Sequence, residues 1–309
     1  MDRIDVAFPS SSAKCAAWLY YPTTADCNVP CVVMAHGISL TRHHGLTPYA
    51  EAFARAGVAV LVYDHRFIGD SEGQPRQQIR PTEQLEDRRS AVAFARTLDR
   101  IDPNRIIVWG YSLSAGTAIS AAATDPRIAG AILLCPLLDG RWRSNRGLWA
   151  QPRNAAWITG QAIKDSLGTA VVPVAAQPGS HGVLTFPGEL DGFHSITGPG
   201  SPWRNEIRAA PVPGYSLYRP LTNARKLNCP ILIQAGDRDV TVSPRAIDKL
   251  AERVTNAVVR RYDIDHFQPF YGYHPQHIAA DQTDWLKSLA CASEVTSNLI
   301  PVTNPHGNI

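Results

Sequence analysis

Hydrophobic residues of this chain gather in short continuous runs that are separated by segments with helical spacing. Such runs, bounded by Gly, Pro and polar residues, are typical of strands that are covered on both faces. They occupy residues 30–36, 58–63, 106–110, 128–134, 229–236 and 257–262. Two further strands are expected where a turn containing Pro and Ser joins residues 4–8 to 15–21, as an antiparallel start to the sheet.

The intervening segments predict helices that alternate with the strands. In 82–98, an apolar stripe recurs at helical spacing through Leu85, Val92, Ala95 and Leu98. Further helices are expected at 48–56, 244–253 and 275–289. Alternating strands and helices imply right-handed crossovers, with helices on both faces of the sheet. The expected fold class is therefore α/β, with a mainly parallel sheet of eight strands.

The alternation of strands and helices stops at Pro136 and resumes after residue 220. The segment between them, 137–220, is rich in Pro, Gly and aromatic residues, and a helix is expected at 154–166. A structureless loop of this length is improbable in a compact domain, and the tryptophans argue against a disordered linker. We expect one discontinuous core domain (1–136 and 221–291), an inserted cap (137–220) and a flexible tail (292–309).

Composition excludes several classes of function. The 309 residues are 44% hydrophobic and carry a net charge of +3 with neutral His, too small to indicate a nucleic-acid partner. No apolar stretch reaches the roughly 18 residues of a membrane-spanning helix. The first residues lack the apolar core of a signal peptide, so a cytoplasmic protein without membrane contact is expected. The six scattered cysteines lack the spacing of a zinc site, and we expect buried free thiols and neither metal nor cofactor.

The run at 106–110 leads into the sequence WGYSLSAG at 109–116, which is followed by a helix of small residues. This order is that of a nucleophile elbow, where a strained turn exposes a serine and requires small residues two positions before and after it. Gly110 and Ser114 flank Ser112 at those positions, so a serine replaces the usual second glycine. The alternative is that Ser112 merely caps the helix. A cap does not explain the small residues on both sides.

A serine nucleophile requires a histidine base and a carboxylate that orients the histidine. In a doubly wound sheet, these groups gather in loops at the carboxyl ends of the strands. His266 follows the last predicted strand and is the favoured base. Asp239 is the leading candidate for the acid, with Asp237 in the same loop and Asp139 after an earlier strand as alternatives.

The tetrahedral intermediate of acyl transfer needs hydrogen-bond donors for its oxyanion. The backbone N–H of Leu113, directly after the serine, is one expected donor. The second is expected from the loop at 36–39, where the N–H of Ile38 is favoured over the alternative that this loop is a plain turn.

Four stretches carry a family resemblance that covers nearly all of the chain. They are AHGISLTRHHGLTPYAEAFARAGVAVLVYDHRFIGDSEGQPRQ, WGYSLSAG, YRPLTNARKLNCPILIQAGDRDVTVSP and YDIDHFQPFYG. The chain resembles the α/β-hydrolases, and within them a group of esterase-like proteins related to dienelactone hydrolases. That group includes fungal polyketide thiohydrolases and polyketide transferases. The resemblance implies the α/β-hydrolase fold and a triad formed by Ser112, Asp239 and His266. It also implies an oxyanion hole formed by Ile38 and Leu113.

The stretch at 63–73 also fits this group. One interpretation is that it lines the mouth of a substrate pocket. We favour a structural interpretation, in which it forms a buried turn and Asp70 and Ser71 bond backbone groups.

The predicted activity is cleavage of an acyl thioester or ester through an acyl-enzyme on Ser112. The resemblance suggests a thiohydrolase that releases a polyketide chain from its synthase, with the chain held on a carrier domain. Alternatives are an acyltransferase that uses an alcohol, a general carboxylesterase and a non-catalytic binding protein. A medium or long acyl chain is expected to pack against Trp142, Trp149 and Trp157 of the cap, because burial of each CH₂ contributes roughly 0.8 kcal/mol.

Overall fold

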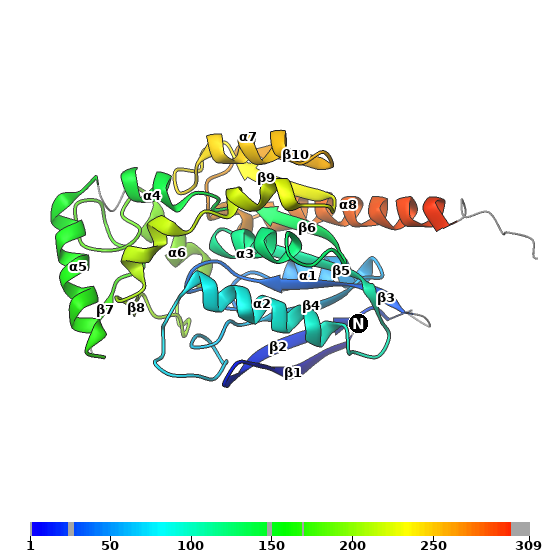
Figure 1. The fold of residues 1–309 in the computed structure, drawn as a ribbon, viewed down its shortest axis with the longest axis horizontal. Helices are drawn as coiled ribbons and strands as arrows, with labels where there is room; N and C mark the ends of the chain where they lie inside the picture. Colours follow the sequence, from blue (N-terminus) through cyan, green and yellow to red (C-terminus); the bar gives the residue numbers. More distant parts are fainter. Residues whose placement is uncertain (1, 24–27, 147–149, 169, 298–309) are drawn as a thin grey trace, which may run out of the picture.

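The predicted strands join one sheet of eight strands (Figure 1). The structure is a computed structural model that describes residues 2–23, 28–146, 150–168 and 170–297. In chain order, the strands are β1 (Asp2–Ser10), β2 (Ala13–Tyr21), β3 (Val29–Ala35), β4 (Ala59–Tyr63), β5 (Ile101–Tyr111), β6 (Ile128–Leu134), β9 (Ile231–Gly236) and β10 (Ala257–Tyr262). Their order in the sheet is β1-β2-β4-β3-β5-β6-β9-β10. The β1–β2 and β2–β4 pairs are antiparallel and the other pairs are parallel, which confirms the mainly parallel sheet.

Helices cover both faces of this sheet. One face packs against α1 (Thr47–Arg55) and α8 (His274–Ser297). The other face packs against α2 (Pro81–Ala95), α3 (Leu113–Ala122) and α7 (Pro244–Arg253). The expected helices are all present. However, α8 runs past its expected end at residue 289 and extends to Ser297, into the segment 292–309 that was expected to be a flexible tail.

The central strands are apolar on both sides because both helical layers bury them. Every residue of β4 is buried, as is every residue from Cys31 to the end of β3. Four cysteines are buried free thiols, as predicted: Cys15, Cys31, Cys135 and Cys229. Among the described residues, none of the helices is long and apolar enough to cross a membrane.

The segment at 137–220 contains several short elements between β6 and β9. They are α4 (Gly140–Arg146), α5 (Pro152–Ser166), β7 (Val171–Val172), α6 (Glu189–Thr197), β8 (Ile207–Arg208), η1 (Val212–Leu217) and the start of η2 (Pro220–Lys226). Of these, only the helix α5 was expected. Figure 1 shows α4, α5, α6 and the β7–β8 pair together at one end of the molecule, opposite the C-terminal end of α8. Phe193 of α6 stacks on Trp203 and contacts Phe267 next to His266, so this segment packs directly against the candidate site.

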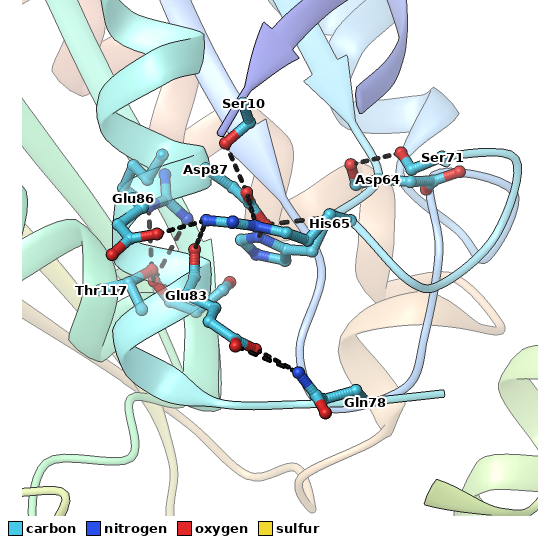
Figure 2. Close-up of polar contacts among 12 residues, drawn as sticks. Ser10, Asp64, His65, Ser71, Gln78, Glu83, Glu86, Asp87 and Thr117 are labelled. Carbon is cyan, nitrogen blue, oxygen red and sulfur yellow. Dashed lines mark hydrogen bonds and ion pairs between the residues drawn. The ribbon is translucent and has the colours of Figure 1, made fainter. Parts of the chain in front are cut away.

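A buried carboxylate, Asp87, ties the start of the chain to α2 (Figure 2). The Ser10 hydroxyl donates to Asp87 at 2.6 Å, and the His65 Nδ1 lies 3.3 Å from the same carboxylate. The Nε of Arg66 also donates to it at 2.6 Å. These contacts fix the loop between β4 and α2, because two of its residues, His65 and Arg66, bond the same carboxylate of α2 as Ser10 of β1.

The turn at 63–73 agrees only in part with the structural interpretation. The Ser71 hydroxyl donates to the Asp64 backbone carbonyl at 2.8 Å, as expected. The Asp70 carboxylate was predicted to bond backbone groups, but it bonds none in the part of the chain that the structure describes. It instead accepts from the Arg42 guanidinium at 2.7 Å and lies 3.0 Å from the His43 Nε2, because its side chain points outward, 60% exposed.

Candidate active site

Ser112 forms a strained turn between β5 and α3. The strand ends at Tyr111 and the helix begins at Leu113. Ser112 has φ 54° and ψ −118°, a conformation that costs about 1–3 kcal/mol for a residue with a side chain. A Cβ at Gly110 would lie 2.4 Å from the Ser114 carbonyl oxygen, so this position requires glycine. The local geometry is that of the predicted elbow.

Ser114, which replaces the usual second glycine, has a structural partner. Its hydroxyl donates to the Ala35 carbonyl at 2.7 Å and accepts from the Tyr111 N–H at 3.0 Å. The side chain is fully buried and does not line the cavity at Ser112. Ser114 therefore ties the elbow to the end of β3.

The structure brings together the three residues predicted as a triad. The Nδ1 of His266 lies 2.6 Å from Asp239 Oδ2, and its Nε2 lies 3.0 Å from Ser112 Oγ. All three residues are buried. The other carboxylate oxygen, Oδ1, accepts the backbone N–H groups of Thr241 at 2.8 Å and Val242 at 3.1 Å, which fixes the orientation of the carboxylate.

The two alternative acids lie elsewhere. Asp237 has an exposed side chain that pairs with Arg261 at 3.4 Å. Asp139 lies 3.5 Å from Arg219 and accepts a local backbone N–H. The turn after β9 therefore selects Asp239 as the carboxylate that contacts His266.

Two residues that were not predicted from the sequence support this geometry. The Tyr111 hydroxyl donates to the His266 carbonyl at 2.9 Å, which holds the histidine loop against β5. Arg88 of α2 is fully buried and donates to the Trp109 carbonyl at 3.0 Å and the Ser114 carbonyl at 3.2 Å. Its guanidinium thus bridges the strand and the helix on either side of Ser112. An arginine in a helix next to buried residues resembles any surface arginine in sequence, so only its contacts reveal this role.

The loop after β3 presents a second free N–H group beside the serine. His36 accepts the Gly37 N–H on Nδ1 at 2.8 Å and lies 2.8 Å from the His44 carbonyl through Nε2. Burial lowers the pKa of His36 well below its usual value, so the ring is neutral and Nε2 is the donor. In the described part of the chain, the N–H groups of Ile38 and Leu113 donate to no protein acceptor, and both residues line the cavity at Ser112.

That cavity is small and largely enclosed by apolar side chains. It has a volume of about 50 Å³. Besides Ile38, Ser112 and Leu113, its lining consists of Leu137, Gly140, Val183, Leu184, Val212, Tyr215 and Thr241. Since one water needs roughly 10–15 Å³, the cavity has room for about three to five water-sized groups. Most of its apolar wall comes from the segment at 137–220.

Two of the three tryptophans predicted to bind substrate, Trp142 and Trp157, do not line this cavity. Trp157 stacks on His181 with ring centroids 4.7 Å apart, so it packs within the inserted segment. Trp142 is half-buried and lies under the guanidinium of Arg146. Trp149 lies outside the described residues. The aromatic residue in the cavity wall is Tyr215, whose hydroxyl donates to the Ile79 carbonyl at 2.9 Å.

One buried cluster consists of three side chains of types that bind metal ions. Cys135, Asp239 and His266 hold their donor atoms within 4.8 Å of one another. However, Asp239 and His266 already bond each other, and burial raises the pKa of the Cys135 thiol well above its usual value. A metal needs the thiolate and a free imidazole nitrogen, so this group fits a metal poorly.

Comparison with known proteins agrees with this architecture. A family model described as serine aminopeptidase, S33 matches residues 27–177. The quorum-quenching protein AidA of Acinetobacter baumannii (strain MDR-ZJ06) is 36% identical over 292 residues, covering 93% of this chain and 95% of that protein. The crystal structure of the alpha/beta hydrolase GrgF from Penicillium sp. sh18 superposes with a TM-score of 0.79 at 23% identity, over 93% of this chain and 99% of that one. The chain belongs to the α/β-hydrolase superfamily.

A fungal relative of this hydrolase has a named activity. Thiohydrolase aneE of Aspergillus aculeatus is 42% identical over 118 residues, which cover 38% of this chain and 37% of that protein. These similarities identify the chain as a hydrolytic enzyme, in a group that includes fungal thiohydrolases.

Proposed function

We propose that this hydrolase cleaves an acyl ester or thioester through an acyl-enzyme on Ser112. The observation that carries the proposal is the continuous chain of contacts from Ser112 Oγ through His266 to Asp239. Beside it, the backbone N–H groups of Ile38 and Leu113 have no acceptor among the described residues. A non-catalytic binding protein does not require this arrangement. In particular, it does not require a serine held at a positive φ.

The mechanism follows from this geometry. His266 Nε2 accepts the proton of Ser112 Oγ as the oxygen attacks the acyl carbon, and Asp239 stabilises the imidazolium through Nδ1–H. The N–H groups of Ile38 and Leu113 donate to the oxyanion of the tetrahedral intermediate. His266 then protonates the leaving group. Water, activated by the same histidine, releases the acid and restores Ser112.

The volume of the cavity at Ser112 limits the size of the acyl group that it can hold. In this conformation, about 50 Å³ accommodates a short acyl group, whereas a polyketide chain requires the wall formed by Leu184, Val212 and Tyr215 to move. The similarity to a thiohydrolase supports a thioester substrate, which includes a polyketide chain on a carrier domain. An alcohol that reaches the acyl-enzyme in place of water would make the same site an acyltransferase.

A second candidate substrate is a lactone, which is an internal ester. AidA, which aligns over 93% of this chain, is named for quorum quenching, and this supports a small acyl signal molecule as substrate. The same serine chemistry opens a lactone ring, and no separate leaving group then departs.

A fluorophosphonate probe tests the proposal. The wild-type protein is expected to react at Ser112, as mapped by peptide mass spectrometry, whereas Ser112→Ala and His266→Ala should not react there. Turnover is then compared for acetyl, butanoyl and octanoyl thioesters, the matching p-nitrophenyl esters and an N-acyl lactone. A wild-type protein that is folded and unreactive at Ser112 would sink the proposed mechanism.

A further inference from the structure

A second cavity, of about 260 Å³, adjoins the loop that carries Ile38. Its lining comes from the loop after β3, the loop after β4 and the inserted segment: Ser39, Thr41, His43, His44, Gly69, Asp70, Arg76, Gln77, Pro202, Trp203 and Arg204. Ile38 lines the cavity at Ser112, and the next residue, Ser39, lines the second cavity. The two cavities therefore meet the same loop at consecutive residues.

The second cavity differs from the first in its charge. Two arginines, Arg76 and Arg204, line it, whereas the wall at Ser112 is largely apolar. Burial, and then the positive charge of Arg204, lowers the pKa of Arg76, while the carboxylates of Asp64 and Asp70 act in the opposite direction. An anion between the two guanidinium groups would relieve the repulsion between Arg76 and Arg204.

Arg76 is held in position by neutral acceptors. Its guanidinium donates to the carbonyl of Gly69 at 2.5 Å and to the carbonyl of Ser71. Among the described residues, no carboxylate forms an ion pair with Arg76. Arg204 pairs with Glu206, but its side chain is 60% exposed. Arg76 is thus a cation held in place by carbonyl oxygens, and the more distant carboxylates of Asp64 and Asp70 only partly offset its charge.

The carboxylate in this cavity is already engaged. Asp70 Oδ2 accepts from Arg42 at 2.7 Å and lies 3.0 Å from His43 Nε2. Ser39 Oγ accepts the indole N–H of Trp203 at 3.1 Å, and among the described residues its own proton has no acceptor. The cavity therefore offers a hydroxyl donor and two guanidinium groups on a side of the loop that the acyl cavity does not occupy.

We propose that this second cavity binds an anionic group on the leaving-group part of the substrate, a phosphate or a carboxylate, through Arg76 and Arg204. The inference rests on the proposed function, since it assigns the acyl group to the apolar cavity at Ser112 and the leaving group to the second cavity. Guanidinium groups suit this role because their planar N–H pairs match both phosphate and carboxylate oxygens. The Ser39 hydroxyl supplies a further donor.

Matched thioesters test the inference. S-acetyl-pantetheine and its 4′-phosphate differ by one phosphate group, and S-acetyl-3-mercaptopropionate carries a carboxylate instead. The wild-type kcat/KM should favour an anionic thioester over the neutral one, with the difference in KM. Arg204→Gln should reduce this preference about fivefold, the effect of an exposed charge pair of up to roughly 1 kcal/mol. Arg204→Lys should retain part of it, and Arg127→Gln, an exposed arginine distant from the cavity, should retain all of it.

These measurements distinguish a phosphate from a carboxylate as the bound anion. They also distinguish failure of the anion site from failure of the proposed function. A preference for the phosphate alone identifies a phosphate-bearing leaving group, and a preference for the carboxylate alone identifies a carboxylate. Hydrolysis of the neutral thioester without any anionic preference overturns the anion site and leaves the proposed function intact. If no thioester is cleaved, calorimetry of 4′-phosphopantetheine and pantetheine with Ser112→Ala decides the matter, since equal affinities would overturn the anion site.

Discussion

The orientation of Asp239 leads to a sharp prediction for Asp239→Asn. The two N–H groups of Thr241 and Val242 converge on Oδ1, so the oxygen of an asparagine amide would occupy that position. The NH₂ group would then face His266 Nδ1, which in the wild type lies 2.6 Å from an acceptor oxygen. A donor at this position forces Nδ1 to accept, and the imidazole proton moves to Nε2.

A protonated Nε2 cannot accept the proton of Ser112. Loss of the correct tautomer in a serine triad lowers turnover by about 10⁴, which corresponds to about 5.5 kcal/mol at roughly 1.4 kcal/mol per tenfold change. We therefore expect kcat for p-nitrophenyl acetate to fall by about 10⁴ in Asp239→Asn. The melting temperature should change little, because the amide oxygen keeps both loop hydrogen bonds.

Asp237→Asn is the matched control, two residues earlier in the same loop. Its exposed carboxylate pairs with Arg261, so its loss should change kcat by less than about twofold. A folded Asp239→Asn variant that keeps more than a tenth of wild-type turnover would refute the reasoning, as would an equal loss in both variants.

Three further predictions concern stability and acyl specificity. Gly110→Ala should lower the free energy of unfolding by about 1–3 kcal/mol in urea titrations, because its Cβ would meet the Ser114 carbonyl at 2.4 Å. The control is Gly160→Ala, whose Cβ would lie in open space and which should raise the free energy of unfolding by about 0.5–1 kcal/mol. Burial lowers the pKa of His44 to about 4, below the usual value of about 6.5, so the unfolded chain binds the extra proton and stability should fall by up to about 3 kcal/mol between pH 6.5 and 4. His44→Gln should reduce that loss of stability. A variant whose stability falls with pH as much as that of the wild type would contradict the prediction. Leu184→Ala should raise kcat/KM for longer acyl esters, relative to shorter ones, by about fourfold per newly buried CH₂, at about 0.8 kcal/mol each. If the dependence of kcat/KM on chain length is the same as in the wild type, Leu184 does not form part of the acyl wall.

The sheet, its helices and the elbow could be predicted from the sequence because their signals are local. A buried parallel strand is a continuous apolar run, as in β3 and β4, wherever it lies in the sheet. The small residues around Ser112 follow from the close approach of a strand and a helix at one turn. The inserted segment was predicted poorly, since short elements such as α6 and the β7–β8 pair have too few residues to show a period.

The sequence by itself thus determined the fold class, the elbow and a small set of candidates for the base and the acid. Only the tertiary structure decided that Asp239 rather than Asp237 meets His266, because the turn after β9 directs the two carboxylates differently. It also decided that Ser114 bonds Ala35 and that Arg88 bridges the elbow. These contacts join residues far apart in the chain, and their partners depend on packing distances that no local pattern of hydrophobic and polar residues encodes.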